Sequence, residues 1–219
     1  MIEDFKVLCH SAIRIVADNK IIYIDPYGIE KKYNDADYIC ITHSHYDHFS
    51  PEDILKVKNN DSIILITEDI YVNVLKMGFK ENKIVIVDPD KKYKIKDLYV
   101  ETISSYNIDK PFHPKSNGWV GYILNLGYER VYISGDTDVT SEALKVKCDL
   151  AFIPVGGTYT MYYAEAAKLA NAIEPTIVVP IHYGKIAGTV QDAKNFKCLL
   201  NNKIDCKIMI WFGGVFYDI

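Results

Sequence analysis

The sequence has few cysteines and lacks a long hydrophobic run. No stretch of about 18 consecutive apolar residues occurs, so we expect no membrane-spanning helix and no membrane partner. The five cysteines are odd in number and form no Cys-x-x-Cys pair, which argues against a disulfide framework and against a thiolate zinc site. The first residues are acidic and lack a basic segment before an apolar run, so we expect no secretory signal. Together these features indicate a cytoplasmic protein.

An excess of positive charge is also missing. The chain of 219 residues carries 25 Lys and Arg against 29 Asp and Glu, a net charge of −4, so nucleic acid is not expected as a partner. Hydrophobic residues make up 49% and charged residues 25%, which is typical of a folded globular protein. Because no linker, repeat or low-complexity tract interrupts the chain, we predict a single domain over residues 1–219.

Short apolar runs of β type recur along the chain and alternate with fewer helical segments. We predict an opening β-meander with a turn at Asp18-Asn19. The expected strands are residues 5–8, 12–16, 20–24, 38–42, 62–66, 83–87, 93–95, 98–103, 119–126, 130–134, 150–154, 176–180 and 207–210. The expected helices are one that begins at Ser50-Pro51 and those over residues 68–77, 140–146, 164–172 and 191–200. This order predicts an α/β fold in which two sheets pack together with helices outside.

One segment concentrates the metal-binding side chains. Residues 38–50 read YICITHSHYDHFS, in which an apolar strand leads directly into His43, His45, Asp47 and His48. Three imidazoles and a carboxylate within six residues cannot all be buried without partners. A divalent metal would satisfy them together, because neutral imidazole and carboxylate oxygen are ligands for zinc, iron and manganese.

The run HSHYDH resembles the HxHxDH signature of the metallo-β-lactamase superfamily. The resemblance implies a four-layer αβ/βα sandwich of two packed β-sheets, with one or two metal ions at one edge of the sheets. It implies that His43, His45, Asp47 and His48 are metal ligands. Two later segments match further motifs of the superfamily. In VYISGDTD, Asp136 follows a strand and a glycine, and by resemblance it bridges two metals; in TIVVPIHYG, His182 ends a strand and by resemblance binds the second metal.

The third superfamily motif, a ligand histidine between the first motif and Asp136, departs from the pattern. The segment reads ETISSYNIDKPFHPKSNGWVGYIL, with Asn107 where the histidine is usual and His113 six residues later. One interpretation makes His113 the ligand, reached by a longer loop. The other places Asn107 there, which weakens the first metal site and leaves His113 to meet substrate.

Two stretches resemble the narrower UPF0173-like and UlaG-like branch of the superfamily. Leu8-Cys9-His10-Ser11 resembles its opening motif and Ile24-Asp25-Pro26 its D-P step. We expect Asp25 to hydrogen bond a ligand imidazole and so set its tautomer, whereas His10 is expected to be a core or turn residue close to the site. The loop PVGGTYTM, residues 154–161, offers Tyr159 for substrate contact and backbone N–H groups for an anion, although Thr160 equally suits a helix N-cap.

The resemblance implies a metal-dependent hydrolase. We expect two zinc ions, with manganese and iron as alternatives, and a metal-bound hydroxide that attacks an ester, lactone or phosphodiester-type substrate. Asp47 would both bind metal and hold the hydroxide. The expected partner is an anionic small molecule, with self-association of the chain left open. The alternative is a non-catalytic or mononuclear descendant of the fold that binds a metal or another ligand.

Overall fold

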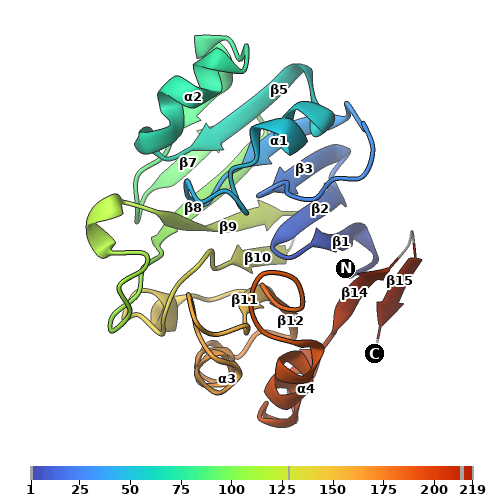
Figure 1. Cartoon of the computed structure of the whole chain (residues 1–219), viewed down its shortest axis with the longest axis vertical. Helices are drawn as coiled ribbons and strands as arrows, with labels where there is room; N and C mark the ends of the chain where they lie inside the picture. Colours follow the sequence, from blue (N-terminus) through green and yellow to red (C-terminus); the bar gives the residue numbers. More distant parts are fainter. Residues whose placement is uncertain (1, 128, 213–214, 219) are drawn as a thin grey trace. The chain divides into compact units, whose positions relative to one another are not determined.

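The structure is a computed structural model that describes residues 2–127, 129–212 and 215–218. The chain divides into two compact units, Met1–Asp88 and Pro89–Ile219, and each is built on a β-sheet of its own (Figure 1). None of the helices within the described ranges has the length and hydrophobicity needed to cross a membrane.

The first unit is a six-stranded sheet whose strand order follows the chain. An antiparallel meander is followed by parallel pairing, in the order β1 (Phe5–Cys9), β2 (Ala12–Ala17), β3 (Lys20–Ile24), β4 (Ala36–Cys40), β5 (Lys58–Ile66) and β6 (Ile84–Ile86). Asp18 and Asn19 both have positive φ, 51° and 58°, as a tight turn matched to the strand twist requires. The predicted meander and its turn are therefore confirmed.

The helices of the first unit begin and end close to where the sequence signals predicted. The side-chain oxygen of Ser50 caps α1 (Pro51–Val57) by accepting a hydrogen bond from the backbone N–H of Asp53. A short 3₁₀ turn, η2 (Glu68–Ile70), leads into α2 (Tyr71–Lys76), and Gly78 follows its end with φ 81°. Two further 3₁₀ turns are η1 (Ile2–Asp4) and η3 (Glu81–Lys83).

The second unit is a seven-stranded mixed sheet. The strands pair antiparallel from β7 to β10 and parallel from β10 to β13. Their bounds are β7 (Lys92–Ile95), β8 (Leu98–Ser104), β9 (Val120–Leu126), β10 (Glu129–Ile133), β11 (Leu150–Pro154), β12 (Ile177–Ile181) and β13 (Asp205–Cys206). A separate hairpin consists of β14 (Met209–Phe212) and β15 (Val215–Asp218). The short turn η4 (Lys115–Asn117) precedes β9.

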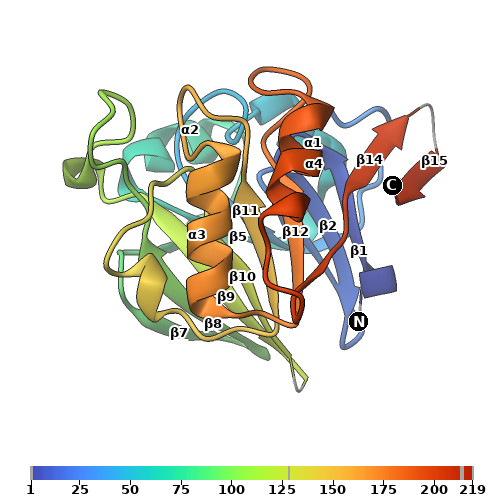
Figure 2. The ribbon, with the colours of Figure 1, turned by 90° about the horizontal axis from the view of Figure 1, so that it is seen from below.

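Two helices cover one face of this second sheet. Figure 2 shows α3 (Tyr163–Ile173) and α4 (Val190–Cys198) side by side over β11 and β12. The buried face of α3 is rich in alanine, and small side chains allow the helix to approach its neighbours closely. The hydrophobic core between these helices and the sheet includes Phe196, Leu169, Ala170, Ile153 and Val178.

One prediction of local structure was wrong, and the cap that was left open at Thr160 is not formed. The segment 140–146 forms only the 3₁₀ turn η5 (Ala143–Lys145), because a single turn closes on Thr140 and Val146 is already extended. Thr160 does not cap α3. The helix starts after Tyr162, whose backbone N–H donates to Oε2 of Glu165 at 2.9 Å.

Candidate metal centre

The loop that follows β4 carries the histidine cluster of the first unit. The apolar strand ends at Cys40, and the chain turns at His45, whose carbonyl accepts hydrogen bonds from the backbone N–H groups of His48 and Phe49. His43 and His48 are buried and their rings lie 4.0 Å apart, centroid to centroid. The turn thus brings side chains that are close in the sequence to one place.

Asp25 organises this loop from the end of the neighbouring strand β3. Its Oδ1 accepts from the backbone N–H of Thr42 at 2.8 Å, and its Oδ2 accepts from the Thr42 hydroxyl at 2.6 Å. The Nδ1 atom of His48 lies 2.7 Å from the same Oδ2. Burial raises the pKa of the Asp25 carboxyl, and the charge of His48 together with these hydrogen bonds opposes that rise.

These hydrogen bonds set the tautomers of two imidazoles. A carboxylate only accepts, so His48 donates through Nδ1–H and leaves the lone pair on Nε2. The Thr42 hydroxyl spends its proton on Asp25, so it accepts from Nδ1–H of His43, which lies 2.9 Å away. His43 therefore also presents Nε2 as a lone pair, which is the form that binds a metal.

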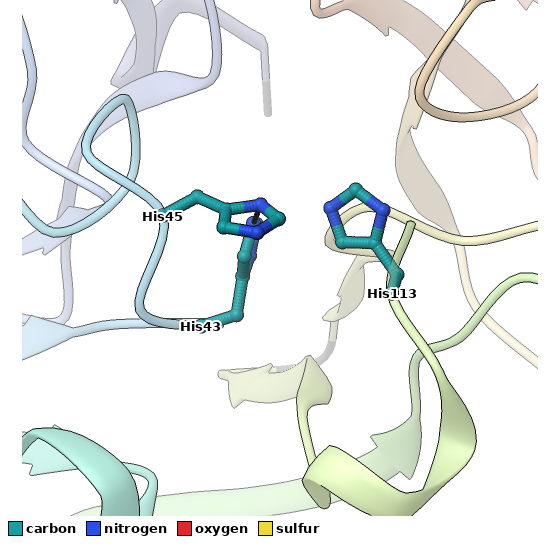
Figure 3. A group of neighbouring side chains, drawn as sticks. All are labelled: His43, His45 and His113. Carbon is teal, nitrogen blue, oxygen red and sulfur yellow. Dashed lines mark hydrogen bonds between the residues drawn. The ribbon is translucent and has the colours of Figure 1, made fainter. Parts of the chain in front are cut away.

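The other candidate ligand atoms of the first unit, on His45 and Asp47, lie close to these imidazole nitrogens. Nε2 of His43 lies 3.2 Å from Nδ1 of His45, the dashed contact in Figure 3. Oδ2 of Asp47 lies 3.6 Å from Nε2 of His48 and 3.3 Å from Nε2 of His10. The expectation for His10 as a core or turn residue matches its burial and its φ of 52°, and in addition it contacts Asp47.

A second cluster lies in the second unit, on loops that follow three of its strands. Asp136 comes after β10, His113 after β8 and His182 directly after β12; His113 is labelled in Figure 3. Oδ2 of Asp136 lies 3.1 Å from Nε2 of His182 and 3.3 Å from Nε2 of His113. All three side chains are at most 4% exposed. Residues that are far apart in the sequence thus meet around one carboxylate oxygen.

The backbone is strained at several of these positions. His113 and His182 have φ of 56° and 58°, and Asp25 has φ of 44°. Left-handed backbone is uncommon for residues other than glycine, and it persists where the surroundings hold it in place, often at functional sites. His113 and His182 contact Asp136, and Asp25 orients His48.

The structure gives different contacts to Asn107 and His113, the two residues considered for the third motif. Nδ2 of Asn107 donates to the carbonyl of Tyr159 at 2.7 Å and lies 3.3 Å from Nδ1 of His113. The His113 ring packs edge-on against Trp119, with centroids 5.5 Å apart. Thus His113 reaches the carboxylate of Asp136, whereas the Asn107 amide links two loops.

The loop 156–161 already uses several of its own backbone donors. The N–H of Gly157 donates to Met161, and those of Tyr159 and Thr160 both donate to the carbonyl of Gly157. The N–H of Tyr162 is taken by Glu165. The loop therefore offers less to an anion than its glycines suggested.

The donor sets fit a divalent metal. Two ligand atoms of a tetrahedral zinc ion lie about 3.3 Å apart when each bond is about 2.0–2.1 Å. Within each unit, the imidazole nitrogens and carboxylate oxygens described above are separated by 3.1 to 3.6 Å. The residue types are also right, since neutral imidazole and carboxylate suit zinc, manganese and iron.

Sequence reasoning missed two residues that hold these clusters in place. The Thr42 hydroxyl donates to Asp25 and accepts from His43, so it links the two residues. The sequence signal that could have revealed this role is a hydroxyl residue placed between an apolar strand and the histidine motif. Gly156 lies against His182, where a Cβ would come within 2.1 Å of the histidine's carbonyl oxygen. No local pattern in the sequence indicated that contact.

Comparisons with known proteins agree on one family. The profile of the family described as Beta-lactamase superfamily domain matches residues 4–182. A UPF0173 metal-dependent hydrolase of Methanosarcina mazei is 30% identical over 96% of this chain and 97% of its own length. Among solved structures, a protein from Parabacteroides distasonis has a TM-score of 0.78 at 30% identity, covering 93% of this chain and 91% of that one. Igni18, a metallo hydrolase from Ignicoccus hospitalis, has a TM-score of 0.76 at 21% identity and covers 98% of both chains. The expected fold class is confirmed.

Proposed function

This chain belongs to the metallo-β-lactamase superfamily, in its UPF0173 branch, and from that premise we propose that it is a metal-dependent hydrolase of an ester, lactone or phosphodiester-type small molecule. The observation that carries the proposal is the spacing of ligand atoms within each unit, such as 3.1 Å between His182 Nε2 and Asp136 Oδ2. The proposed metal ligands are His43, His45, Asp47, His48, His113, Asp136 and His182.

We propose further that residues 1–219 act as one domain. The family profile supports this because its match, residues 4–182, runs through both units. The number of carboxylates and imidazoles is sufficient for two ions, for which we propose zinc, with manganese and iron as alternatives. All five cysteines are free thiols, which supports the proposal that the protein functions in the reducing cytoplasm.

A bound divalent cation would supply Lewis acidity, which lowers the pKa of a water molecule and polarises the bond to be broken. The protein's own side chains orient the metal ligands and the attacking water. Asp25 and Thr42 hold His43 and His48 in the tautomer that presents Nε2. Asp47, with Oδ2 3.3 Å from His10 Nε2, orients the attacking water and receives its proton. A negatively charged substrate would be drawn to the cations.

The proposal is tested by elemental analysis of the protein purified without added metal or chelator. We expect about two equivalents of metal per chain, hydrolysis of ester, lactone or phosphodiester probes, and loss of turnover on chelation that the same metal restores. Chelation should also lower the melting temperature, since a ligand held at about 1,000 times its Kd stabilises by about 4 kcal/mol.

Two variants sharpen this test. Asp136→Ala should abolish turnover and lower the metal content while circular dichroism shows a folded chain. Asp109→Ala, an exposed residue of the same unit, is the matched control and should retain both. Full activity in Asp136→Ala would exclude the dinuclear proposal. One equivalent of metal with no turnover of any probe would favour the alternative, a mononuclear or non-catalytic ligand-binding descendant.

A further inference from the structure

An aromatic pair lies next to His113 on the surface of the second unit. The rings of Phe112 and Tyr159 meet edge to face with centroids 4.9 Å apart, yet Phe112 is 39% exposed and Tyr159 36%. Ile108, in the same loop as Phe112, is 58% exposed. Exposed apolar side chains that contact one another, as Phe112 and Tyr159 do, form a candidate binding surface.

The two loops that bear this pair are held together from beneath. Nδ2 of Asn107 donates to the carbonyl of Tyr159, and the backbone N–H of Asn107 donates to the carbonyl of His113 at 2.9 Å. Asn107 is buried, so these bonds are shielded from water. The position of the aromatic pair is therefore tied to the position of His113.

The two lysines of the loop that bears Phe112 are paired with carboxylates. Lys110 forms ion pairs with Asp138 and Glu165, and Nζ of Lys115 lies 2.6 Å from Oε1 of Glu142. The backbone N–H groups of Tyr159 and Thr160 are satisfied inside their loop. This surface thus suits an uncharged, apolar group far better than a phosphate or carboxylate.

We propose that Phe112 and Tyr159 bind an apolar ring or aryl group of the substrate, beside the end that reacts. This deepens the proposed function and rests on it, because it takes the surroundings of His113 to be where substrate binds. The hydrolysed compound is then an aryl- or ring-bearing ester, lactone or phosphodiester whose charge, where it has one, lies away from the ring.

The test measures binding to the metal-loaded protein by NMR titration, with three carboxylates of equal charge that cannot be hydrolysed. We expect 3-phenylpropanoate and 3-cyclohexylpropanoate to bind about tenfold or more tightly than propanoate, because only they bury a ring. Phe112→Ala and Tyr159→Ala should each remove most of that advantage without weakening propanoate. Tyr159→Ala keeps the carbonyl that Asn107 binds.

Tyr99→Ala is the matched control, since Tyr99 is another exposed aromatic residue of the second unit, on β8, and should leave the ring preference unchanged. Equal affinity of the wild type for all three ligands would overturn the inference, as would an equal loss in Tyr99→Ala. Hydrolysis is scored separately. Ring preference without turnover of any probe would contradict only the hydrolase, and turnover without ring preference would contradict only this inference.

Discussion

Oδ2 of Asp25 lies 2.7 Å from Nδ1 of His48, and both side chains are almost completely buried. The contact joins the left-handed residue after β3 to the histidine motif after β4. It fixes which ring nitrogen of His48 carries the proton, and through Thr42 it does the same for His43. A single carboxylate thus sets the tautomer of two imidazoles, in which Nε2 carries the lone pair.

Asp25→Asn should lower metal affinity about 10- to 100-fold, the usual effect of losing a residue that orients a ligand. The asparagine can still accept from His48 through one atom, but its NH₂ group would then face the N–H of Thr42, a second donor. Competition with a chromophoric chelator measures the affinity. Asp37→Asn removes a carboxylate that accepts from the backbone N–H of Ile21 in the same sheet, and it serves as the control. Equal affinities in the two variants would show that Asp25 does not orient the ligands.

Gly156→Ala should both destabilise the protein and displace His182. The added Cβ would lie 2.1 Å from the His182 carbonyl oxygen, and overpacking of this kind lowers the free energy of unfolding by about 1–3 kcal/mol. Gly78→Ala is the matched control, because its Cβ would meet nothing within 4 Å and only the positive φ of 81° adds strain, about 1–2 kcal/mol. Urea denaturation should show a loss of stability in both variants, while elemental analysis should show a loss of metal only in Gly156→Ala. Full metal content in Gly156→Ala would contradict the role of this contact.

The ion pair of Lys115 and Glu142 should make a small contribution to stability that depends on pH. The hydrogen bond from Lys115 lowers the pKa of Glu142 to about 2. A lowered acid pKa gives stability that is complete above the ordinary value of about 4.3 and is lost as the pH falls toward 2. Lys115→Gln should return the pKa of Glu142 toward its ordinary range, as read by carbon NMR titration of the carboxyl groups. Because the Lys115 side chain is largely exposed, the shift in the urea midpoint at pH 7 should be slight. A Glu142 pKa that stays near 2 in the variant would contradict the assigned cause.

Much of the strand and helix order follows from local pattern. The run that became β4 and the opening meander were predicted because a short apolar run carries its own signal. The start of α1 was equally clear, since the cap, the proline and the acid lie within four consecutive residues, Ser50 to Asp53. A weaker local signal failed at segment 140–146, where hydrogen bonds to Thr140 close a single 3₁₀ turn in place of a helix.

The proposed metal ligands of the first unit can be read from the sequence, because His43, His45, Asp47 and His48 are neighbours along the chain and the motif is recognisable without the fold. The way in which these side chains are held depends on tertiary contacts. Parallel pairing sets Ile24 opposite Cys40, and this register carries Asp25 to the backbone N–H of Thr42 and to Nδ1 of His48. In the same way the strand order of the second sheet, not the spacing along the chain, brings His113 and His182 to Asp136. Contacts between segments far apart in the sequence depend on strand register and order, which no local pattern of residues encodes.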